Sequence, residues 1–489
     1  MQRSLWVGAV LCAVVGCAKP VEFRDSMPPV SGGLPTRDMM QVDPPPEPEP
    51  EVHEAVVTLE ADTNVSGLPA DTPSSFVARL RIRPEPLEGV PKPPVSVALV
   101  LDASGSMEGE ALDKAKTAAL DFVDALDDTD RVSLVVFHSA TETLVPLRTL
   151  GDGGREQVRE AVGMLQANGT TDLAGGLAAG FAQVRQALGQ GGGTRVVLLS
   201  DGRPNNAQSI FPSVDQAARE GITVTALGLG LEYDEDLLGR IAQRTGGKFH
   251  FAESPDQVAA LFRQEVLALQ RIVAQHANLV VVPGPGMKIR RVLGPSQRSG
   301  TGFMMQIGDL VEQRERDVYV LLESEGHRAG ARVEVLDAHL SYYDPLSKKG
   351  KTQRTFLGSR ALEEGSPTSD AQIDLATARA LAADDALAAM ALARGGNLRA
   401  AKKRLVSALE RAKKDAKRFD DDELRDKVDE LLALKKALPS LVPPRPSRPR
   451  MRGAAVGRVM APMEVAPAPR VGGAATKRSH ASSMAELGY

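Results

Sequence analysis

The sequence predicts an α/β fold in which a doubly wound, Rossmann-like parallel sheet is inserted into a β-sandwich. Two observations support this prediction. Over residues 93–270, short apolar runs alternate with stretches of helical periodicity, which favours a mostly parallel sheet with helices on both faces. The flanking segments 53–92 and 271–362 contain strand patterns only, as expected for an antiparallel sandwich.

The N-terminal residues resemble an export signal. Arg3 precedes a short apolar run, and the run ends at Val14-Val15-Gly16-Cys17. This ending resembles a bacterial lipobox, and the resemblance implies that 1–17 is a lipoprotein signal peptide and that Cys17 carries lipid. The alternative is an ordinary secretory signal with an incidental cysteine. Ala18 follows in place of Asp, which by the same resemblance implies an outer-membrane lipoprotein of the bacterial cell envelope.

The composition of the chain limits the kinds of site and partner that the protein can have. The only cysteines among the 489 residues are Cys12 and Cys17, which excludes structural disulfides and cysteine-bound zinc from the body of the protein. The net charge of −4 gives no reason to expect a nucleic-acid partner. Residues 18–52 alternate proline with acidic residues near their end, so we expect an extended tether there.

The elements follow in order along the chain. Two early strands are predicted at 56–60 and 75–82, and we expect them to pair with strands that come much later. The alternating region predicts strands and helices in turn: strands 95–101, 131–137, 144–147, 195–199, 222–227 and 248–252, and helices 111–126, 155–165, 173–188, 213–220, 234–244 and 255–270.

The part of the chain after residue 270 changes character twice. Five more sandwich strands are predicted at 277–282, 287–292, 303–307, 318–322 and 333–342. Residues 370–438 then read as a small helical hairpin built from three helices, 373–394, 398–419 and 421–438. Residues 439–489 are basic and rich in proline and small residues, so we expect a disordered tail.

Oxygen-bearing side chains follow the first buried strand of the alternating region. Asp102, Ser104 and Ser106 stand at a spacing of two, at the carboxyl end of that strand, where open α/β sheets bind ligands. Hard oxygen ligands of this kind suit Mg²⁺. On their own, these three residues would equally well form a turn and cap a helix.

Two further loops complete a known pattern. Thr171 precedes a predicted helix, with Thr170 as a less favoured substitute, and Asp201 follows a later strand. Together with Asp102, Ser104 and Ser106, the pattern resembles the metal-ion-dependent adhesion site of von Willebrand factor type A (VWA) domains. The whole arrangement is similar to bacterial VWA proteins labelled calcium-activated chloride channel-like. The resemblance implies Mg²⁺, with Mn²⁺ or Ca²⁺ as alternatives, and a protein partner that presents Asp or Glu.

The residue types favour binding over catalysis. The five positions supply two carboxylates and three neutral hydroxyls, which would leave a cation electrophilic and open to a partner carboxylate. No phosphate-binding glycine loop, dinucleotide fingerprint or His-Glu-x-x-His motif occurs, and we expect His138 to be structural. The sequence therefore predicts a membrane-anchored binding module and not an enzyme. The alternatives are a metal-dependent hydrolase and a structural envelope lipoprotein without metal-dependent binding.

Overall fold

The computed structural model describes most of the chain beyond the predicted tether. The described residues are 56–86, 93–190, 192–201, 209–230, 233–254, 256–269, 271–362, 367–442 and 473–489. They all belong to the compact unit Val52–Tyr489, which is separate from the unit Met1–Glu51. The predicted signal peptide with Cys17, and the whole predicted tether 18–52, lie outside the described residues. Across the described ranges, no helix has the length and apolar character needed to cross a membrane.

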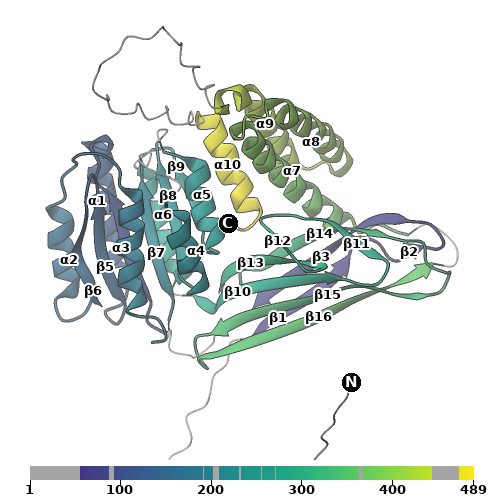
Figure 1. Cartoon of the computed structure of the whole chain (residues 1–489), viewed down its shortest axis with the longest axis horizontal. Helices are drawn as coiled ribbons and strands as arrows, with labels where there is room; N and C mark the ends of the chain where they lie inside the picture. Colours follow the sequence, from purple (N-terminus) through teal and green to yellow (C-terminus); the bar gives the residue numbers. More distant parts are fainter. Residues whose placement is uncertain are drawn as a thin grey trace, which may run out of the picture. The chain divides into compact units, whose positions relative to one another are not determined.

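A six-stranded sheet forms the centre of the alternating region (Figure 1). Its strand order is β6-β5-β4-β7-β8-β9, and only β6 runs antiparallel. The bounds are β4 Ser96–Asp102, β5 Arg131–Phe137, β6 Thr141–Thr149, β7 Thr194–Ser200, β8 Thr223–Leu229 and β9 Phe249–Ala252. The chain winds outward first through β5 and β6 and then through β7 to β9. The direction reverses between β4 and β7, and open α/β sheets bind ligands at such a switch point.

Helices cover both faces of this sheet, because side chains of the central strand alternate between them. Val97, Leu99 and Leu101 pack with α1, α2 and α6, whereas Ala98 and Val100 pack with α3, α4 and α5. The helix bounds are α1 Glu110–Asp124, α2 Gly154–Gly163, α3 Leu173–Arg185, α4 Phe211–Arg219, α5 Glu235–Arg244 and α6 Asp256–Leu269. The predicted doubly wound fold is therefore confirmed.

The flanking strands form a two-sheet sandwich around a separate core. One sheet has the order β1-β3-β14-β11, and the other β12-β13-β10-β15-β16-β2. The bounds are β1 Val57–Thr63, β2 Leu68–Pro69, β3 Ser74–Pro84, β10 Ile272–Pro283, β11 Met287–Val292, β12 Gln297–Ser299, β13 Gly302–Val311, β14 Arg316–Ser324, β15 Arg332–Asp344 and β16 Lys349–Leu362. Strand β3 precedes the α/β region in the sequence and β14 follows it, yet the two strands pair directly in one sheet. The predicted insertion is therefore confirmed.

A buried ionic cluster joins the α/β sheet to the sandwich. Arg195 on β7 donates to Glu265 of α6 at 3.2 Å and to Asp309 of β13 at 2.7 Å. His250 Nε2 lies 3.0 Å from the other oxygen of Glu265. Burial alone would raise the pKa of Glu265, but the hydrogen bond with His250 and the charges of Lys248 and Arg195 outweigh it and lower the pKa. The cluster thus ties β7, α6 and β13 together by charge.

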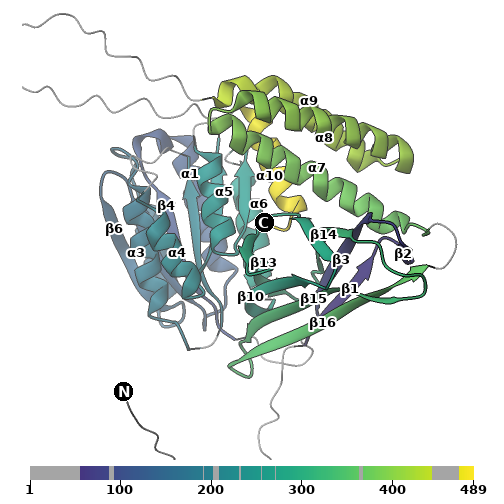
Figure 2. The same cartoon turned by 45° about the vertical axis from the view of Figure 1, so that its right-hand side comes forward.

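Three helices follow the sandwich and pack side by side (Figure 2). They are α7 Ala371–Arg394, α8 Leu398–Phe419 and α9 Asp422–Ala437, followed by the short 3-10 turn η2 Leu438–Leu441. Asp370, Asn397 and Asp421 cap the three helix N-termini with side-chain oxygens. A helical segment after the sandwich was predicted, and the structure has it.

The C-terminal residues differ from the expected disordered tail. Ala474–Glu486 form a further helix, α10, whose Met484 is fully buried in the core shared with α3 to α5. Lys477 is also fully buried; its ammonium donates to the carbonyl of Tyr233 at 2.7 Å and lies over the Tyr233 ring. The prediction of disorder for 439–489 is therefore wrong over 439–441, which belong to η2, and over 474–486, and residues 443–472 lie outside the described part.

Candidate metal centre

The first loop of the site starts at Asp102, the last residue of β4, which is fully buried. Its Oδ1 accepts a hydrogen bond from the backbone N–H of Ser104 at 2.9 Å, and its Oδ2 accepts one from the Ser200 hydroxyl at 2.6 Å. Burial raises the pKa of the Asp102 carboxyl, while the bonds from Ser104 and Ser200 oppose that rise. Its hydrogen-bond donors are all neutral.

Two serines extend from this buried carboxylate toward solvent, in and just before the 3-10 turn η1 (Gly105–Met107). The hydroxyl of Ser104, which is buried, lies 3.1 Å from that of Ser106, which is exposed. Ser106 in turn donates to Oδ1 of Asp201 at 2.8 Å. Four of the five predicted residues are thus joined by hydrogen bonds, directly or through Ser200 and the Ser104 backbone, and the group is accessible from outside at Ser106.

The second loop lies against the first through backbone hydrogen bonds. The N–H of Gly105 donates to the carbonyl of Gly169 at 3.0 Å, and the N–H of Asn168 donates to the carbonyl of Ala103 at 2.8 Å. Gly169 has a φ of +70°, and a Cβ there would stand 2.2 Å from Oγ of Ser139. This close approach requires glycine at position 169.

Thr171 occupies the end of this second loop and is 6% exposed. Asp172 directly after it caps α3 by accepting from the N–H of Gly175 at 3.1 Å, which fixes the loop against the helix. Thr170 bonds instead to Ser139, with its N–H 2.9 Å from the Ser139 hydroxyl. Across the described residues, no hydrogen bond joins the Thr171 hydroxyl to the other four side chains. The backbone bonds of Asn168 and Gly169 hold the loop that contains Thr171 beside the first loop.

The donor set fits a hard divalent cation. Two carboxylates and three hydroxyls provide oxygen alone, which is what Mg²⁺ prefers. Among the described residues, the buried Asp102 carboxylate accepts from neutral donors only, and a buried carboxylate without a positive partner is costly unless a cation offsets its charge. Within the described ranges, no cluster of three or more His, Cys, Asp or Glu residues forms, so acidic groups alone do not build a metal site here.

Two other polar residues lie near the loops, His138 and Ser200. The ring Nδ1 of His138 accepts from the N–H of Ala140 at 3.2 Å, in the turn that follows β5. Ser200, which holds Asp102, was not assigned a role from the sequence. Its place next to Asp201 in Ser-Asp-Gly was the available signal, because a residue that ends a strand beside the site can reach the neighbouring strand end.

The doubly wound sheet and its oxygen-rich loops define a von Willebrand factor type A module. The model of the von Willebrand factor type A domain family matches residues 96–264, and this segment of the chain is a VWA domain. The predicted resemblance is therefore confirmed at the level of the domain.

Similar proteins extend this assignment. The uncharacterized protein sll0103 of Synechocystis sp. is 26% identical over 272 residues, which cover 52% of this chain and 63% of that protein. Calcium-activated chloride channel regulator 1 of Bos taurus is 30% identical over 158 residues, covering 32% of this chain and 17% of the regulator. The chain thus spans less than two thirds of each relative.

A solved structure shares the fold over most of the chain. It is a von Willebrand factor type A protein from Catenulispora acidiphila, with a TM-score of 0.64 and 18% identity. The match covers 89% of this chain and 97% of that one. The shared fold therefore extends well beyond the VWA domain itself.

Proposed function

We propose that this protein is a binding module that takes a protein partner through a divalent cation held at its VWA domain. Asp102, Ser104, Ser106, Thr171 and Asp201 would hold the ion, with Mg²⁺ the preferred metal and Mn²⁺ or Ca²⁺ the alternatives. When bound, the ion would supply an electrophilic position that accepts a carboxylate oxygen. VWA domains generally mediate protein interactions, which supports the proposal at the level of the family.

The observation that carries the proposal is the gradient of burial across the site. Asp102 and Ser104 are buried, whereas Ser106 is exposed and bonded to Asp201. The carboxylate at the base is held in one orientation by Ser104 and Ser200, so the first loop is arranged before any ligand arrives. In this proposal, an Asp or Glu side chain of the partner would approach the site at the exposed Ser106.

We also propose that the chain acts in the bacterial cell envelope, anchored to the outer membrane by lipid on Cys17. The lipobox-like ending of the apolar N-terminal run supports this proposal. Metabolic labelling with a fatty acid analogue tests it, and Cys17→Ser should abolish the label. Label retained in Cys17→Ser would contradict lipidation at that residue.

The binding function is tested by capture of partners from an envelope extract. Immobilised protein should retain a partner in Mg²⁺ and release it in EDTA, and an acidic peptide in excess should compete. Asp102→Ala should not retain it. Retention that is equal in Mg²⁺, in EDTA and with Asp102→Ala would contradict a metal-dependent binding module. The prediction that the protein is not an enzyme stays a prediction.

A further inference from the structure

Helix α8 concentrates positive charge in a chain that is acidic overall. Of its 22 residues, nine are Lys or Arg and two are Asp or Glu, a balance of nine minus two, or +7. The whole chain carries a net charge of −4. The charge of α8 is therefore a local feature and does not follow from the average composition.

The arginines in the middle and at the end of α8 are used inside the molecule. Arg404 and Arg411 pair with Asp385 of α7, and Arg418 pairs with Asp374 of the same helix at 2.9 Å. These arginines are spaced by seven residues, which is close to two helical turns, so they share the side of α8 that faces α7. The ion pairs between α7 and α8 thus neutralise the charge of these three arginines.

The other six basic residues lie on a different side of the helix, and we call this set of residues the basic stripe. Its members are Arg399, Lys402, Lys403, Lys413, Lys414 and Lys417. At about 100° per residue they fall within an arc of roughly 120° and extend over about 27 Å. All six side chains are exposed, and none of them forms an ion pair with another described residue. Glu410 is the acidic residue on this side.

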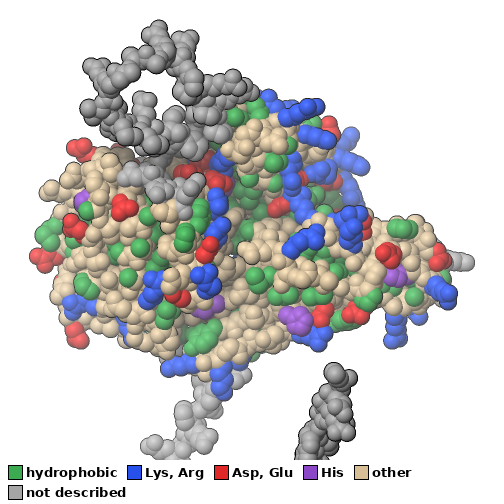
Figure 3. Space-filling view, viewed as in Figure 1, with side chains coloured by type: hydrophobic (Ala, Val, Ile, Leu, Met, Phe, Trp, Pro, Cys, Tyr) green, Lys and Arg blue, Asp and Glu red, His purple; other side chains and the backbone are tan. Residues whose placement is uncertain are grey.

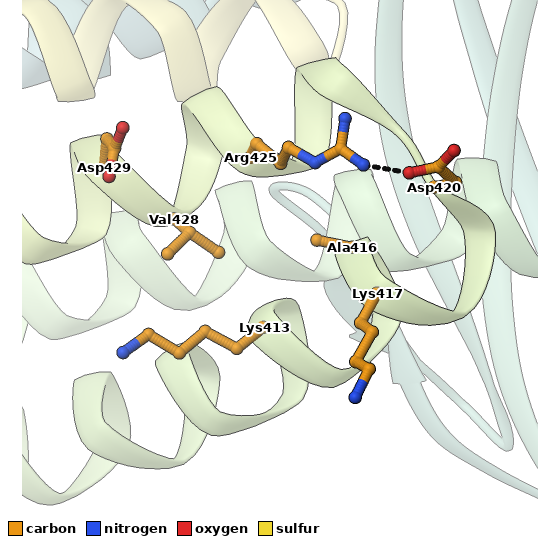
Figure 4. Close-up of a pocket in the computed structure, with 7 residues that line it drawn as sticks. All are labelled: Lys413, Ala416, Lys417, Asp420, Arg425, Val428 and Asp429. Atoms are coloured by element: carbon orange, nitrogen blue, oxygen red, sulfur yellow. Dashed lines mark hydrogen bonds and ion pairs between the residues drawn. The ribbon is translucent and has the colours of Figure 1, made fainter.

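Positive side chains gather on the surface around α8. Figure 3 shows Lys and Arg side chains gathered over the region of α8 and α9. A shallow hollow lies beside the C-terminal half of the stripe, lined by Lys413 and Lys417 together with residues of α9 (Figure 4). There Arg425 is paired with Asp420, so the lysines of α8 supply the unpaired charge.

We propose that the basic stripe lies against a membrane surface that contains anionic phospholipids. A straight row of lysines on a rigid helix matches a plane of diffuse negative charge, and each lysine near such a surface is attracted to it. The stripe includes no aromatic side chain on which bases could stack, which disfavours single-stranded nucleic acid. The proposed lipid anchor on Cys17 would keep the stripe near a bilayer, although the stripe does not depend on the metal site.

Vesicle sedimentation tests this inference on the full chain carrying Cys17→Ser, so that no acyl chain contributes. Vesicles of phosphatidylcholine alone are compared with vesicles that also contain phosphatidylglycerol, and the neutral vesicles report any contribution from the apolar N-terminal run. We expect binding to the anionic vesicles that disappears at high salt, because exposed charges are then screened. Lys402→Gln/Lys403→Gln should weaken it by about five-fold per lysine.

Matched controls keep the test decisive. Lys348→Gln/Lys349→Gln removes an equally exposed pair of lysines at the turn between β15 and β16, and should leave vesicle binding unchanged. Equal weakening by both pairs, or equal binding to neutral and anionic vesicles, would overturn the inference. Binding to DNA without binding to anionic vesicles would also overturn it. Thermal unfolding of each variant should match the parent chain, since these side chains make no ion pair with any other residue in the described ranges.

Discussion

The hydroxyl of Ser106 donates to Oδ1 of Asp201 at 2.8 Å, across 95 residues of sequence. This bond joins the loop after β4 to the loop after β7, at the point where the sheet reverses its winding. The two residues leave the sheet on neighbouring parallel strands, so their loops meet at one edge.

Ser200 should orient the buried carboxylate of the site. Removing its bond to Asp102 with Ser200→Ala should weaken Mg²⁺ binding about 10- to 100-fold, because partners that orient a ligand carry effects of that size. Titration calorimetry measures the affinity. Ser213→Ala serves as the control, since that hydroxyl lies in the first turn of α4 and donates to the carbonyl of Ile210, with no bond to Asp102. An unchanged affinity in Ser200→Ala would contradict the orienting role.

The adjacent threonines of the second loop should differ in how much they contribute to Mg²⁺ binding. Thr171→Ala should weaken Mg²⁺ binding, whereas Thr170→Ala should change it little because Thr170 contacts Ser139 instead. The two variants remove the same atoms from neighbouring positions, so each controls for the other. A larger loss in Thr170→Ala would reassign the second-loop hydroxyl to residue 170.

The ionic cluster between the VWA domain and the sandwich should make stability depend on pH. The pKa of Glu265 is lowered in the folded state, so its contribution is present above the unfolded value, near 4.5, and is lost as the pH falls below that value. Glu265→Gln should therefore cost about 3–5 kcal/mol of unfolding free energy at pH 7, as expected when one partner of a buried ion pair is removed.

The difference in unfolding free energy between Glu265→Gln and the parent chain should shrink below pH 4.5, since the unfolded parent chain then binds a proton that the folded Glu265 does not bind. Urea unfolding at pH 7 and pH 3.5 measures it. The exposed Glu108→Gln is the control and should cost little unfolding free energy at pH 7. A gap that is constant with pH would mean that Glu265 contributes by packing alone.

Helix α10 should be part of the folded core of the VWA domain. Met484 is fully buried against α3 to α5, so Met484→Ala should lower the unfolding free energy by about 2–5 kcal/mol. Met164→Ala removes the same atoms from a side chain that is 67% exposed and should cost little. Equal thermal stability of the two variants would contradict a docked α10.

The sequence was sufficient for the elements that follow apolar periodicity. It located the strands of the central sheet and the residues at their ends, because buried parallel strands read as continuous apolar runs. It missed β16, whose pattern contains only two buried side chains, Leu357 and Ala361, at the sandwich surface. A strand with so few buried side chains shows no clear alternation of apolar and polar residues.

Helix α10 was missed for a related reason. Its buried side is mostly polar and includes Thr476, Lys477, Ser479, His480 and Ser483, so composition alone suggested a solvated tail. The burial of these side chains comes from contacts with distant residues, such as Tyr233 and Glu235 for Lys477. Such contacts leave no local signal. The role of Ser200 likewise depends on which strand ends meet in space.

The central claim is that the three loops hold a divalent cation, and Mg²⁺ titration calorimetry of Asp102→Asn tests it most directly. Asp130→Asn is the matched control, because Asp130 is also a buried carboxylate that accepts backbone N–H bonds, from Val95 and Asp127, outside the three loops. We predict that the parent chain and Asp130→Asn bind one Mg²⁺ ion and that Asp102→Asn, still folded by circular dichroism, binds none. Equal Mg²⁺ binding by folded Asp102→Asn and the parent chain would contradict the claim.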